Sequence, residues 1–305
     1  MPYIINEVDL YRKNKIKKVS VLVNNGRFDQ INNSLSNYQF VQMNGKDYVM
    51  TPGHVFFDFI LTSKDSFPAF KTFFLESIIN KGCTTVIPII PVNRLRDLGQ
   101  QFKKYRHLMI NAPVDFCFGI KISYQTLTEQ LIYKCHHQKC KVIFVNVNHS
   151  KQLDTIPWGF IQHATSFYTI PIIPLLDDTS ISSMEKRKIQ TKWKKITKAH
   201  RIVTSIRKIE EGVPIREDLL MKLGLNPIRG DVRVGANVDY NLYSSETKKA
   251  IVEQNGELNY DKHIPLITVH NGRVIKAGKE KFLFVGSGRE LREVVPSRFK
   301  NNNYI

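Results

Sequence analysis

Six polar side chains lie on or directly after segments that the sequence predicts to be strands. Imidazole, carboxylate, amide and ammonium groups at such strand ends could together bind a small anionic ligand. Two of them, Asp58 and His149, could also act as a catalytic acid–base pair. The alternative is that all six are loop residues at strand exits and share no ligand. The candidates for this pocket are His54, Asp58, Lys121, Asn146, Asn148 and His149.

A second group of possible ligands lies in one short segment, Cys135-His-His-Gln-Lys-Cys140. Thiolates and imidazoles are ligands that zinc accepts, but this spacing is not that of a zinc ribbon or finger. The alternative is a helix C-terminus, where His136 and His137 interact favourably with the helix dipole. We therefore expect neither a metal nor a cofactor in this protein.

A long basic helix is predicted over Ser182–Glu211, with an apolar stripe that includes Trp193. The chain carries a formal net charge of +18 and a pI near 9.7, which attract polyanions such as nucleic acid or an anionic membrane surface. The candidate polyanion contacts on this helix are Lys188, Lys192 and Lys195. The alternative is a surface helix in which the tryptophan packs inward and the lysines are solvated.

Strands and helices alternate from Thr51 onward. Continuous apolar runs such as Cys83–Ile90 and Lys141–Val147 are typical of buried strands, and segments with helical spacing such as Phe67–Asn80 and Val92–Tyr105 separate such runs. This alternation predicts a parallel sheet that is covered on both faces.

Both ends of the chain consist of short strands and tight turns. Asn25-Gly26 and Asn44-Gly45 each lie between apolar runs, which favours β-hairpins. Near the other end, the strand Ile267–His270 is followed by the turn Asn271-Gly272. Because neither end supplies enough strands alone, we expect strands from both ends to pack in one sheet system.

Residues Tyr48–Ile60 resemble the first barrel strand of the amidohydrolase superfamily, in particular its dihydroorotase and hydantoinase branch. In that family an apolar strand leads through Pro-Gly to a metal-binding His-x-His motif. Here Pro52 and Gly53 are present, but the two histidine positions hold Asp58 and Ile60. Further segments resemble the family in the same order, namely Lys81–Val86, Val114–Gly119, Leu223–Leu242 and Thr268–Ile275.

The resemblance implies an α/β fold with a TIM-like barrel and a small β-sandwich. We expect a reduced or incomplete barrel, because Trp158–Gly224 is too short for four strand–helix units of about 30 residues each. The expected domains are a truncated amidohydrolase-like barrel over residues 51–224 and a composite β-sandwich built from residues 1–50 and 225–305.

The resemblance also implies a metal-dependent hydrolase in the parent family, and this chain departs from its ligand pattern. Ile60 offers no lone pair, and the fourth-strand candidate Val142–Val147 contains no lysine that could be carboxylated. We expect an amidohydrolase-like protein without metal-dependent hydrolysis, with a binding, scaffolding or oligomerisation role. One alternative is hydrolysis of a C–N bond in a cyclic amide through a rebuilt site. The other is polyanion binding through the basic helix.

The cellular compartment is inferred from the N-terminal residues, and the oligomeric state is inferred from the incomplete barrel. Met1–Leu10 contains Asn6, Glu7 and Asp9 and does not resemble a signal peptide, so we expect a cytoplasmic protein with reduced cysteines. An incomplete barrel leaves strand edges uncovered, and this favours a homodimer unless the basic helix caps those edges.

Overall fold

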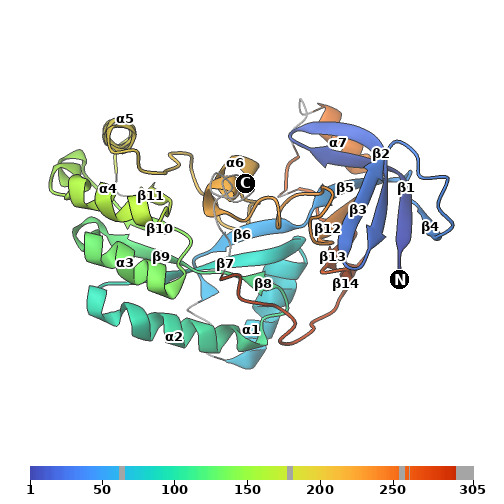
Figure 1. Ribbon diagram of the computed structural model, residues 1–305, viewed down its shortest axis with the longest axis horizontal. Helices are drawn as coiled ribbons and strands as arrows, with labels where there is room; N and C mark the ends of the chain where they lie inside the picture. Colours follow the sequence, from blue (N-terminus) through green and yellow to red (C-terminus); the bar gives the residue numbers. More distant parts are fainter. Residues whose placement is uncertain (62–65, 177–180, 254–257, 261, 293–305) are drawn as a thin grey trace, which may run out of the picture.

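The computed structural model describes residues 1–61, 66–176, 181–253, 258–260 and 262–292. It contains a six-stranded parallel sheet and a nine-stranded mixed sheet, which occupy opposite sides of Figure 1. The parallel sheet curls into an open half-barrel, so the predicted α/β class and incomplete barrel are confirmed at this level. The division into two domains at the predicted boundaries stays a prediction.

The parallel sheet has the order β11-β10-β9-β7-β6, and the short β8 pairs with β7. All the strand pairs in it are parallel, as the apolar strand pattern predicted. Its strands are β6 (His54–Asp58), β7 (Cys83–Pro91), β8 (Asp115–Phe116), β9 (Gly119–Ser123), β10 (Ile143–Asn146) and β11 (Ile172–Leu175).

Helices cover the outer face of this sheet and bury most of the apolar core there (Figure 1). The outer helices are α1 (Phe67–Phe73) with its continuation η2 (Phe74–Ile79), α2 (Leu98–Leu108), α3 (Glu129–Gln138), α4 (Trp158–Phe167) and α5 (Ser183–Ala199). Short 3₁₀ turns accompany them: η3 (Leu95–Asp97), η4 (Met109–Asn111), η5 (Tyr124–Thr126) and η6 (Ser150–Asp154). Two further helices lie elsewhere, α6 (Glu217–Leu223) and α7 (Ser245–Glu253).

Helix α3 explains the cysteine- and histidine-rich segment. It begins after Thr128, whose hydroxyl accepts a hydrogen bond from a backbone N–H of the first turn, and it ends at Lys139 in the left-handed conformation. Cys135 and Cys140 are both fully buried, so their thiols belong to the core. Within the described ranges, no group of three or more His, Cys, Asp and Glu side chains could hold a metal ion.

The mixed sheet has the order β15-β14-β13-β12-β5-β1-β2-β3, and β4 pairs with β1. The prediction that both ends of the chain share one sheet system is therefore confirmed. Its N-terminal strands are β1 (Tyr3–Arg12), β2 (Lys15–Asn24), β3 (Arg27–Asn32), β4 (Val41–Asn44) and β5 (Tyr48–Pro52). Its C-terminal strands are β12 (Tyr240–Ser244), β13 (Ile267–His270), β14 (Arg273–Ala277) and β15 (Glu280–Lys281).

One of the two predicted N-terminal hairpins is wrong. Asn25 and Gly26 form the turn between β2 and β3 with positive φ at both residues, as expected. At Gly45, however, β4 and β5 do not pair with each other, because each pairs in parallel with β1. Gly45 is needed for a close approach, since a Cβ there would lie 2.8 Å from the Asn6 carbonyl oxygen.

The predicted basic helix ends earlier than expected, and the chain that follows it covers both open edges of the parallel sheet. Helix α5 stops at Ala199 instead of Glu211. At the β11 edge, the backbone N–H of Ile172 donates to the carbonyl of Val203 over 2.9 Å. At the β6 edge, the N–H of Ile215 donates to the carbonyl of Val55 over 2.8 Å. The uncovered edges that favoured a homodimer are thus partly satisfied within the chain, and the homodimer itself stays a prediction.

Among the described residues, no helix is long and apolar enough to span a bilayer.

Candidate functional site

The concave face of the half-barrel is filled by helix α6. Leu219, Leu220 and Leu223 of this helix are buried in one cluster with apolar side chains of β6, β7, β10 and β11. The sequence favours a helix here, because Glu217 and Asp218 lie in the first turn and Gly224 ends it in the left-handed conformation. The space that a barrel of this type would enclose is therefore largely apolar core.

The inward-facing positions of β6 carry apolar side chains. Val55 and Phe57 belong to the core on the concave face, whereas Phe56 packs with the outer helices. Because side chains alternate along a strand, Asp58 shares the outer side with Phe56. Accordingly, burial raises the pKa of Tyr105 on α2, and the charge of Asp58 raises it further.

Phe57 lies where a metal-binding side chain of this strand would face the concave side. Phe59, two positions further along, lies on the same side. Their rings lie 5.1 and 5.4 Å from the ring of Phe144 on β10. A phenyl ring offers no lone pair to a divalent ion. The residues at the inward-facing positions of β6 therefore do not fit a metal. From the resemblance to the family, the two ligand positions were expected at Asp58 and Ile60 instead.

The two candidate residues on β6 lie at its opposite ends. Asp58 is the last residue of the strand, and its carboxylate accepts hydrogen bonds from the backbone N–H groups of Ile60 and Leu61 at 3.0 and 3.2 Å. His54 is the first residue, and its Nε2 lies 2.7 Å from the hydroxyl of Tyr243. Burial lowers the pKa of His54 to about 3, so this imidazole is neutral at physiological pH.

Of the other four predicted pocket residues, two lie within β9 and β10 and two follow β10. Lys121 and Asn146 take inward-facing positions, since their strand neighbours belong to the outer core. Asn148 donates its backbone N–H to Gln152, which together with His149 forms a capping box at the start of η6. The ring of His149 also lies 3.6 Å from Glu185 of α5. The structure thus brings Lys121 and Asn146 to one face, and gives Asp58 and His149 different partners.

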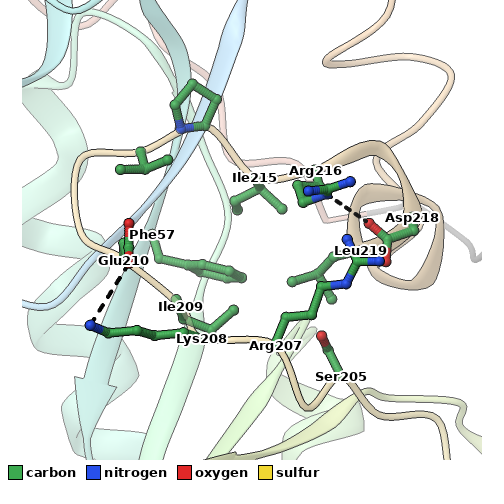
Figure 2. Close-up of a pocket in the computed structure, with 12 residues that line it drawn as sticks. Phe57, Ser205, Arg207, Lys208, Ile209, Glu210, Ile215, Arg216, Asp218 and Leu219 are labelled. Carbon is green, nitrogen blue, oxygen red and sulfur yellow. Dashed lines mark ion pairs between the residues drawn. The ribbon is translucent and has the colours of Figure 1, made fainter. Parts of the chain in front are cut away.

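A cavity of about 320 Å³ lies at the mouth of the half-barrel, beneath the segment that connects the two sheet edges (Figure 2). Its apolar wall consists of Phe57, Ile209, Ile215 and Leu219, which point toward one another in Figure 2. Because Phe57 lies near the carboxyl end of β6, the cavity occupies the side of the sheet where barrel enzymes bind their ligands.

The rim of this cavity is charged, and most of its charges are paired. Arg216 lies 4.0 Å from Asp218, and Lys208 lies 3.8 Å from Glu210. These pairs are exposed and contribute little to stability. Arg207 also lines the rim, and within the described part of the chain its side chain has no ion-pair or hydrogen-bond partner. The cavity therefore combines an apolar wall with one available guanidinium group.

The predicted polyanion contacts lie on the outer helix α5. Lys188 and Lys195 are exposed, and Lys192 forms an ion pair of 2.6 Å with Asp154. Trp193 is fully buried against Trp158, with ring centroids 5.4 Å apart. Its ring cannot stack on a nucleic-acid base, so any polyanion would meet the lysines alone. Polyanion binding by this helix stays a prediction.

A buried ionic network at the junction of the two sheets was missed by the sequence analysis. Arg229 forms ion pairs with Asp115 on β8 and with Asp239, the latter over 3.0 Å. The ring of His270, at the end of β13, lies between the same two carboxylates at 3.5 and 3.1 Å. All four side chains are at most 5% exposed. All four lie in segments that resemble the amidohydrolase pattern, and this resemblance was the signal in the sequence that could have revealed them.

The partners in this network set each other's protonation. Burial raises the pKa of Asp115, but the hydrogen bond to His270 and the charge of Arg229 outweigh burial and bring it down to about 2. Burial lowers the pKa of His270, but hydrogen bonds to Asp115 and Asp239 outweigh it and raise the pKa to about 9. At neutral pH His270 is thus a cation and Asp115 an anion.

Comparison with solved structures identifies the fold. A D-hydantoinase from Bacillus sp. AR9 is similar with a TM-score of 0.63 and 8% identity, over 95% of this chain and 98% of that one. A dihydropyrimidinase from Brevibacillus agri gives 0.57 and 11%, over 96% and 98%. The fold is that of the hydantoinases. A Xaa-Pro dipeptidase with bound methionine is also similar, with 0.54 and 8% identity over 91% of this chain and 100% of that one. No family model and no curated protein matches the sequence.

Proposed function

We propose that this protein is a binding protein built on the hydantoinase fold, and that it takes a small amphipathic anion at the mouth of the half-barrel. The observation that carries the proposal is the filling of the concave face. Phe57 of β6 faces inward, Phe59 packs at the margin of the same cluster, and the leucines of α6 belong to it. Such a surface excludes water and offers van der Waals contacts, but few groups for acid–base work.

The cavity beneath residues 205–216 suits a ligand with a planar apolar body and one acidic group. The body would contact Phe57 and Ile215, and the acid would meet Arg207, whose guanidinium has no described partner. The neighbouring cavity of about 750 Å³ is less suitable, because its cations Arg12 and Lys13 already pair with carboxylates.

The test is fluorescence titration with 2-naphthoate and with its neutral analogue 2-naphthol. We expect the naphthoate to bind more tightly than the naphthol by up to about tenfold, since a charged hydrogen bond at an exposed rim is worth on the order of 1 kcal/mol. In Arg207→Gln the two probes should bind equally. The matched control Arg187→Gln, which removes a cation from α5, should keep the preference.

Ring-opening assays separate this proposal from the hydrolase alternative. Hydantoin and dihydrouracil incubated with the protein and added Zn²⁺, Mn²⁺ or Co²⁺ should remain intact. Turnover that disappears in Asp58→Asn or His149→Gln would instead favour a rebuilt hydrolytic site. Equal binding of naphthoate and naphthol to the unaltered protein would overturn the anion preference.

A further inference from the structure

A separate cavity of about 620 Å³ lies beside the buried ionic network, near the turns that follow β2 and β13. Its walls come from three distant parts of the chain: the turn at Asn25 and Gly26, the turn and strand from His270 to Ile275, and the segment from Phe284 to Arg289. Because these parts belong to the mixed sheet and the chain after it, the cavity is distinct from the one beneath residues 205–216.

The charged side chains that line this cavity are all of one sign, while the carboxylates of Asp115 and Asp239 lie behind them against His270. Arg273 and Arg289 line it together with His270, and no carboxylate is among its lining residues. Within the part of the chain that the structure describes, neither arginine side chain has a carboxylate partner. By contrast, Arg216 and Lys208 at the mouth of the half-barrel are each beside an acid. A cavity with two unpaired guanidinium groups concentrates anions, and the net charge of +18 strengthens this field.

The positions of the two arginines also restrict the ligand. The guanidinium of Arg273 lies 4.6 Å from the centroid of the Phe284 ring, so it is held over an aromatic surface. His270 beneath it is engaged by Asp115 and Asp239, which leaves the arginines as the groups that can bind a ligand. Guanidinium groups match the oxygens of phosphate in bidentate geometry.

We propose that this cavity is a second binding site, specific for a small phosphate monoester, with Arg273 and Arg289 holding the phosphate and Phe284 contacting the organic group. Two cations balance the double negative charge of a phosphate monoester. A carboxylate of the same size carries a single charge and would leave one arginine uncompensated.

The experiment is calorimetric titration of the full chain at low ionic strength with phenyl phosphate, inorganic phosphate and benzoate as probes. Saturable binding of phenyl phosphate is expected, tighter than that of either other probe. The double variant Arg273→Gln/Arg289→Gln should lose about tenfold or more in affinity. Lys188→Gln/Lys195→Gln removes the same charge from α5 and serves as the matched control, so its affinity should stay unchanged. All four side chains are exposed, so both variants should fold, which circular dichroism verifies.

Phe284→Leu sharpens the test, because it removes the aromatic surface and keeps both arginines. It should bind inorganic phosphate as before and lose the preference for phenyl phosphate. Equal weakening in the arginine and lysine variants would show a non-specific charge effect and overturn the proposal, as would binding that does not saturate. The naphthoate preference that depends on Arg207 should be unchanged in Arg273→Gln/Arg289→Gln. The two proposed sites are therefore tested independently of each other.

Discussion

The concave face of the parallel sheet and the junction between the two sheets bury different kinds of side chain. On the concave face, Phe57 packs among aliphatic and aromatic residues that include the leucines of α6. At the junction, Arg229 is enclosed with Asp115, Asp239 and His270. The first region is a hydrophobic core, and the second is a network of paired charges.

The difference shows where this hydantoinase fold places its buried polar groups. At the junction each charge has an opposite charge within reach, and Gly53 allows the two sheets to approach closely. A Cβ on Gly53 would lie 2.4 Å from the Thr84 hydroxyl. Buried charges that are paired with opposite charges favour one arrangement of the groups around them. The junction therefore holds the sheets together, and the groups available to a ligand lie outside this network.

The largest expected effect is the loss of Arg229. In Arg229→Met, Asp115 and Asp239 stay buried without their cation, and removing one partner of such a pair costs about 3–5 kcal/mol. Urea unfolding measures the change in the free energy of unfolding. The exposed pair provides the control, because Arg216→Met should change that free energy by less than about 1 kcal/mol. Similar small losses in both variants would mean that the junction does not hold the sheets together.

A comparable effect is expected on the concave face. Leu220→Ala removes a buried side chain and leaves a cavity against β6, which costs about 2–5 kcal/mol. Met221 of the same helix is 39% exposed, so Met221→Ala should change the free energy of unfolding by about 0.5 kcal/mol or less. If both variants were equally stable, α6 would not be packed in the half-barrel as described.

The network should also give stability a dependence on pH. The folded pKa of His270 is raised to about 9 from its ordinary value of 6.5. Its stabilisation is therefore complete below pH 6.5 and is lost as the pH rises through about 9. Between pH 6.5 and 8 the free energy of unfolding should fall by about 2 kcal/mol, and His270→Gln should abolish this slope. Lys276, whose pKa burial lowers to about 8, acts in the opposite direction at higher pH, so the comparison stops at pH 8.

The smallest effect on stability is expected at Asp58, which occupies the position of a metal ligand in the family. Its carboxylate accepts two backbone hydrogen bonds in the turn after β6. Asp58→Ala should destabilise the protein by about 1–3 kcal/mol, whereas Asp58→Asn keeps an acceptor and should cost less. Thermal unfolding of the two variants distinguishes these cases. A stabilising effect of Asp58→Ala, as expected for a strained functional carboxylate, would contradict the structural role.

Local signals predicted much of this fold. The alternation of apolar strands and helices, Gly224 at the end of α6 and the turn at Asn25 and Gly26 all depend on residues close together in the chain. The pairing of β4 with β1 does not, and the expected hairpin at Asn44-Gly45 was wrong for this reason. Arg229 and Asp115 are likewise separated by more than a hundred positions.

The candidate site was harder to predict, because both sides of β6 are apolar. Val55, Phe56 and Phe57 give no alternation of polar and apolar residues that would reveal which side faces the helices. Asp58 could therefore be placed on the strand but not on a face. The cavity at Arg207 depends on a segment that was expected to be helical and is irregular instead.

Metal content shows whether the concave face of this hydantoinase fold is a hydrophobic core with a ligand cavity at its mouth. The full chain is purified without chelator, equilibrated with Zn²⁺ or Mn²⁺, desalted and subjected to elemental analysis. We predict substoichiometric metal, because the inward-facing side chains of β6, Val55 and Phe57, are apolar and Asp58 lies on the outer side. A stoichiometric ion that is lost in Asp58→Asn would contradict the account.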